Sequence, residues 1–106
     1  METLAFTAVT SSGRAYDIAF PLHPQTRSAQ GVSDLLTAVL EAVSRTAEGR
    51  NDVSDGDVFQ ALAMALAVRA RMVGGSAEHL ESLVTGLFAD AHAAARQAQP
   101  YAAGRA

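Results

Sequence analysis

The chain has 106 residues, a net charge of −3 at pH 7 and no cysteine. This length fits one domain with one hydrophobic core, so a second catalytic domain is excluded. The lack of cysteine excludes disulfides, iron–sulfur clusters, thiolate metal sites and cysteine nucleophiles. Because 23 of the hydrophobic residues are alanine, few large side chains are left to fill a core, and a partner chain is one way to make up the shortfall.

Charge and hydropathy also narrow the classes of partner. All eight basic residues are arginines scattered along the chain, whereas proteins that bind the phosphate backbone concentrate basic residues in a patch, so no nucleic-acid partner is expected. The longest uncharged apolar stretch, Val58 to Val68, is about half the ~20 residues that span a bilayer. The N-terminus lacks the basic start of a secretory signal. We therefore expect a cytoplasmic protein without membrane contact, with the alanine-rich, lysine-free composition typical of a bacterial-like, GC-rich coding bias.

Residues 3–22 alternate between apolar and polar around Ser11-Ser12-Gly13, which predicts a β-hairpin. A two-residue loop would mix apolar and polar side chains on each face. A three-residue loop with glycine last gathers the larger apolar side chains on one face and suits a turn that needs a positive φ. These side chains are Leu4, Phe6, Ala8, Tyr16, Ile18 and Phe20. We predict the three-residue loop.

The first predicted strand has neither a charge nor a proline from Thr3 to Ser12, the devices that normally protect a sheet edge. The second strand ends at Pro21, which cannot donate a ladder hydrogen bond. Because an isolated hairpin is only marginally stable in water, either helices cover it or another copy pairs with it. We predict that two hairpins meet across a two-fold axis as a four-stranded antiparallel sheet in a homodimer.

Two helices are predicted after a connecting loop at 23–31. The first has one apolar stripe from Val32 to Val43, and it begins either near Asp34 after Ser33 or earlier after Ser28. The second begins after Ser54, which precedes an acid by three residues as in a capping box, and it ends at Gly74-Gly75. Its body is apolar on nearly all sides, which predicts that it forms the centre of the fold or is shared with a partner.

A third helix is predicted from about Ala77 to Gln97, capped by Ser76 and carrying an apolar stripe from Leu80 to Ala95. The fold class is therefore α+β, an N-terminal antiparallel β-hairpin followed by three α-helices (ββααα). Residues 1–99 form a single domain and residues 100–106 a disordered tail.

The third helix carries the only cluster of side chains with metal-ligand chemistry, including Glu78, His79 and His92. Its spacing matches neither the Glu-x-x-His pairs of dimetal bundles nor a His-Glu-x-x-His motif. A solvated helix face explains these residues, and a metal site bridging a dimer is the alternative. No cofactor is predicted.

Catalytic patterns are missing from the sequence. We find no nucleophile elbow and no phosphate-cradling glycine loop, and Ser54 and Ser76 occupy helix-cap positions. No catalytic residue is predicted, and the sequence favours a protein that is not an enzyme.

Three functional hypotheses follow. The first is a non-enzymatic interaction or regulatory module that acts through a helical or strand-edge surface, as a homodimer or with an unidentified protein partner. The second is a dimer that binds a small apolar ligand in a pocket between sheet and helices, lined by Phe6, Phe20, Phe59 and Met64. The third is a metal-assisted enzyme that uses Glu78, His79 or His92.

Overall fold

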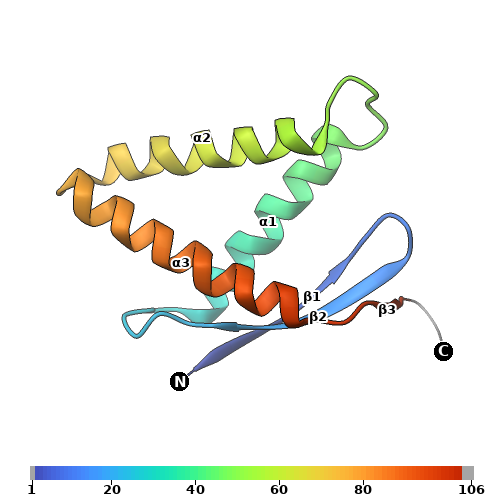
Figure 1. Ribbon diagram of the computed structural model, residues 1–106, viewed down its shortest axis with the longest axis horizontal. Coiled ribbons are helices and arrows are strands. Elements are labelled where there is room, and N and C mark those ends of the chain that lie inside the picture. Colours follow the sequence, from blue (N-terminus) through green and yellow to red (C-terminus); the bar gives the residue numbers. More distant parts are fainter. Residues whose placement is uncertain (1, 104–106) are drawn as a thin grey trace. The chain divides into compact units, whose positions relative to one another are not determined.

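The computed structural model describes residues 2–103 of the chain. Its elements in chain order are β1 (Thr3–Val9), β2 (Arg14–Pro21), α1 (Ala29–Ala47), α2 (Asp55–Val73), α3 (Ala77–Gln97) and β3 (Tyr101–Ala102) (Figure 1). This order confirms the predicted α+β class and adds a third strand. The contacts divide the chain into two compact units, residues 1–33 with 84–106, which we call the sheet unit, and residues 34–83, which we call the helical unit. A single domain over residues 1–99 stays a prediction.

The hairpin has the predicted register. β1 and β2 pair antiparallel with Leu4 opposite Phe20 and Phe6 opposite Ile18. Gly13 closes the loop with φ 87°, a conformation that glycine adopts without steric cost. Side chains along β1 alternate between half-buried and exposed, as expected when one face of a sheet is apolar.

The third strand pairs with β2 on the side away from β1, so the sheet order is β1-β2-β3. Tyr101 pairs with Ala15, and the Tyr101 hydroxyl donates a hydrogen bond of 2.9 Å to Oδ1 of Asp17. Ala15 is 1% exposed and is the one buried residue in the described part of the chain. Residues 101–102 thus form a strand within the segment predicted as a tail, and residues 104–106 of that prediction lie outside the described residues.

Serine caps set the starts of α1 and α2. Ser28 Oγ accepts a hydrogen bond of 2.8 Å from the Gly31 amide, so α1 has the earlier of its two predicted starts. Ser54 and Asp57 form the predicted capping box, in which each side chain accepts a 3.1 Å hydrogen bond from the other residue's amide. α2 ends at Gly74, which has φ 82°, as predicted.

The third helix also has its predicted bounds, and the His79 amide donates a 3.2 Å hydrogen bond to the Ser76 hydroxyl. None of the three helices contains a buried residue. Within this chain α2 is therefore not the buried centre of a core. Sharing of α2 with a partner stays a prediction.

Candidate interaction surface

Large apolar side chains are exposed on all three helices. Soluble monomers rarely expose contiguous apolar patches of more than a few hundred Å², and larger patches mark interaction sites. The exposed apolar side chains on the helices are Val32, Leu35, Val39, Leu40, Phe59, Met64, Leu66, Val68, Met72, Val73, Leu87 and Phe88. Half of them belong to α2, which makes this helix the main candidate surface.

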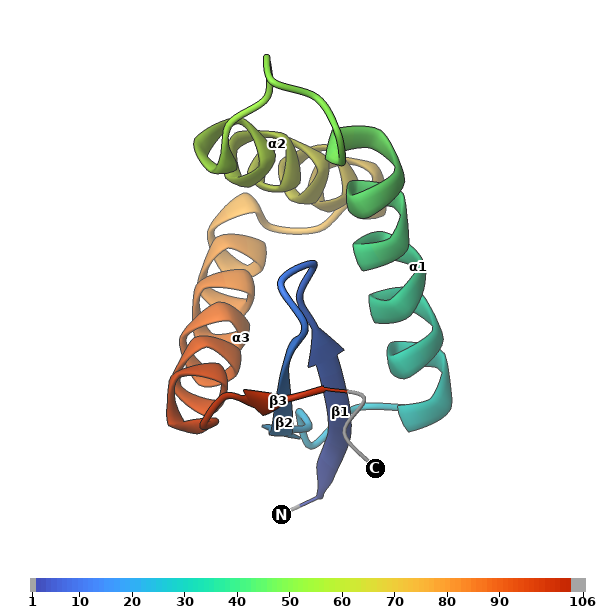
Figure 2. The same cartoon turned by 90° about the vertical axis from the view of Figure 1, so that its right-hand side faces the viewer.

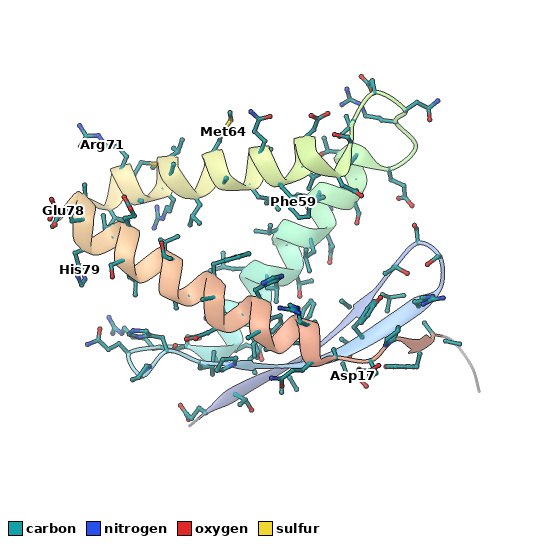
Figure 3. All side chains as sticks on the ribbon, in the orientation of Figure 1. Asp17, Phe59, Met64, Arg71, Glu78 and His79 are labelled. Atoms are coloured by element: carbon teal, nitrogen blue, oxygen red, sulfur yellow. The ribbon has the colours of Figure 1, made fainter. Side chains whose placement is uncertain are left out.

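Two opposite sides of α2 are apolar. Met64, Val68 and Met72 follow each other at intervals of four residues and form one stripe, the Met64 face, with exposures of 57%, 58% and 69%. Phe59, itself 70% exposed, belongs to a second stripe, the Phe59 face, together with Leu62, Leu66 and Val73. Figure 3 shows Phe59 and Met64 projecting from opposite sides of the helix. A single neighbouring element cannot cover both faces.

Within the helical unit, the chain itself approaches only one of these faces. α1 and the first turns of α3 leave the two ends of α2 towards the same side of the helix (Figures 1 and 2). Phe59 projects towards that side and Met64 away from it (Figure 3). In this unit the Met64 face therefore has no intrachain neighbour.

The predicted metal ligands are spread along α3. His79 lies in the first turn, and the His92 ring stacks on Phe88 with centroids 5.3 Å apart. Thirteen residues of helix separate the two histidines by about 20 Å, so one chain cannot place both on one ion. The described residues contain no group of three or more His, Asp or Glu side chains that could hold a metal. A site that uses Glu78, His79 or His92 across a dimer stays a prediction.

The four predicted pocket residues fall into two groups. Phe6 and Phe20 meet in the sheet unit, where their ring centroids are 6.4 Å apart. Phe59 and Met64 lie in the helical unit on opposite sides of α2 (Figure 3), so one pocket beside this helix would contact one of them. The apolar-ligand pocket stays a prediction.

No protein-family model matches the sequence, and no curated protein or solved structure is significantly similar to it. Over the described residues, none of the helices has the length and hydropathy needed to cross a membrane. The class of the protein is therefore defined by its own features. It is a small α+β chain that presents unburied apolar helix faces.

Proposed function

We propose that this protein is a non-enzymatic interaction module that works as a homodimer, through helical and strand-edge surfaces. The observation that carries the proposal is that none of the three long helices has a buried residue although each has an apolar face. Isolated helices are marginal in water, and most helical stability in proteins comes from packing an apolar face. Folding of these helices is therefore coupled to association.

The open edge of β1 supports the strand-edge part of the proposal. The Leu22 amide donates to the Glu2 carbonyl, and the Thr10 amide donates to the Arg14 carbonyl. Backbone amides alternate in direction along a strand, so these two bonds show that the even-numbered amides of β1 point towards β2. The odd-numbered amides, such as that of Ala5, therefore point towards the open edge. Two such edges can pair across a two-fold axis, which joins the two hairpins as four strands, with β3 at each outer side.

The experiment that tests the proposal measures association directly. We expect light scattering of the full chain at micromolar concentration to give about twice the mass of 11.0 kDa. Because a dimer is stabilised by mass action, the midpoint of thermal unfolding should rise with chain concentration. A monomer that unfolds cooperatively at a midpoint independent of concentration over a hundredfold range would overturn the proposal.

A further inference from the structure

We propose that α2 pairs antiparallel with α2 of a second copy of this chain through the Met64 face, with Asp57 of each copy against Arg71 of the other. This inference rests on the proposed function and names the surface and the partner. It concerns the face of α2 that points away from α1 and α3 within the helical unit (Figures 1 and 3).

The Met64 face is continuous and alternates large and small side chains. Ala61 and Ala65 lie along the same side as Met64, Val68 and Met72, because each of the five residues is three or four positions from another. Together they form one stripe about 17 Å long. Alanine allows two helix backbones to approach closely, and methionine adapts its shape to the gaps that remain. The three large members are all more than half exposed.

A two-fold axis at position 64, near the middle of this stripe, brings the Met64 faces of two copies together. In this antiparallel pair Met64 lies next to the partner's Met64, and positions equally far from the centre, such as 57 and 71, lie level with each other. The alanines at 61 and 65 let the two helices approach closely.

Charge also selects the antiparallel pairing. Asp57 and Arg71 lie near opposite ends of the stripe and on the same flank, and Figure 3 shows Arg71 on the Met64 side of α2. The ion pairs among the described residues, Arg45 with Glu41 and Arg50 with Asp52, involve neither Asp57 nor Arg71. Antiparallel pairing sets Asp57 against the partner's Arg71 twice, whereas parallel pairing would set like charges together. Antiparallel helix dipoles add to this preference.

A mixing experiment tests the charge pairing. Arg71→Glu and Asp57→Lys should each dimerise roughly tenfold more weakly than the native chain, because each places like charges together twice. An equimolar mixture of these two variants should form heterodimers in preference to either homodimer, because every charge then faces its opposite. Both the mixture and the Asp57→Lys homodimer contain chains without the carboxylate that accepts the Ser54 amide, so their difference reports the charge pairing. Arg69→Glu is the matched control, since it makes the same charge change on a different side of α2, and it should dimerise normally and not rescue Asp57→Lys.

Cross-linking tests the register without relying on affinity. The chain has no native cysteine, so Ala65→Cys introduces a single thiol next to the two-fold axis, and mild oxidation should link it to the same residue of the partner. Ala63→Cys puts the thiol on the other side of α2 and should not cross-link. A native dimer with no Ala65→Cys cross-link and no rescue on mixing would overturn this inference but not the proposed function. A monomeric native chain would overturn both.

Discussion

The carboxylate of Asp17 connects all three strands of the sheet. It belongs to β2 and accepts hydrogen bonds on Oδ1 from Thr7 in β1, at 2.8 Å, and from Tyr101 in β3, at 2.9 Å. The hydrogen bond to Asp17 raises the pKa of Tyr101, because loss of the phenol proton would break it and place two negative charges together. The exposed side chain of Asp17 thus adds to the backbone pairing that holds the two-residue strand β3 on β2.

Replacing Asp17 by asparagine should lower the pKa of Tyr101 towards its ordinary value of about 10. In the native chain the pKa is higher in the folded than in the unfolded state. The contribution of this hydrogen bond to stability is therefore complete below about pH 10 and is lost as the pH rises through the folded pKa. Ultraviolet titration of phenolate in a Tyr16→Phe background isolates Tyr101. An unchanged pKa in Asp17→Asn, with Asp90→Asn as the control, would contradict this account.

A second residue-scale prediction concerns Ser54. Ser54→Ala removes the side chain that accepts the Asp57 amide and so opens the capping box at the start of α2. Loss of such a cap costs about 1 kcal/mol, which urea unfolding at one fixed chain concentration can measure. Ser82→Ala, in the exposed middle of α3, is the control and should change the stability little or raise it slightly, because alanine is the better helix former. Equal effects of the two substitutions would count against the capping box.

At the scale of elements, the sequence predicts those features that residues close together in the chain determine. The hairpin register follows from side-chain alternation and a turn glycine, and the bounds of α2 and α3 follow from serine caps and Gly74-Gly75. β3 could not be predicted in this way, because it depends on a hydrogen bond between residues 84 positions apart. The apolar sides of α2 are visible in the sequence, but how far the chain leaves them exposed depends on the directions of α1 and of the first turns of α3.

The edge of β1 gives a prediction that is independent of α2. Ala5→Pro removes an amide that points to the open edge, so the hydrogen bonds between β1 and β2 should survive. If two β1 edges pair in the dimer, dimerisation should weaken at least tenfold, on the order of the loss of two interchain hydrogen bonds, while the circular dichroism of the strands is retained. Sedimentation measures the affinity, and Ala5→Thr, which keeps the amide, should behave as the native chain. Unaltered dimerisation of Ala5→Pro would leave the helices as the sole interface.

At the scale of the whole molecule, the two units differ in what stabilises them. The sheet unit has a paired hairpin, a third strand and the buried Ala15. In the helical unit α2 is covered little by its neighbours, since the large side chains on both of its faces are exposed. If the proposed dimer forms, we expect the stability of these helices to be a property of the dimer rather than of the chain.

Hydrogen exchange at different chain concentrations checks this difference. Protection of the α2 amides should rise as the concentration is raised from well below to well above the dissociation constant, because opening of the helix then requires dissociation. Amides that join β1 to β2 should change less. If α2 is equally protected at every concentration, its faces are covered by its own chain and the dimer hypothesis is wrong.

If the Met64 face lies on a two-fold axis, as proposed, an evolutionary consequence follows. In the proposed dimer each residue of this face enters the interface twice, so one codon change alters two contacts at the same time. Enlarging Ala61 or Ala65 would introduce a clash in both halves of the interface, whereas a change on the Phe59 face lies outside this interface. Variation among descendants of this gene should therefore be more restricted along the Met64 face than exposure in the single chain would imply.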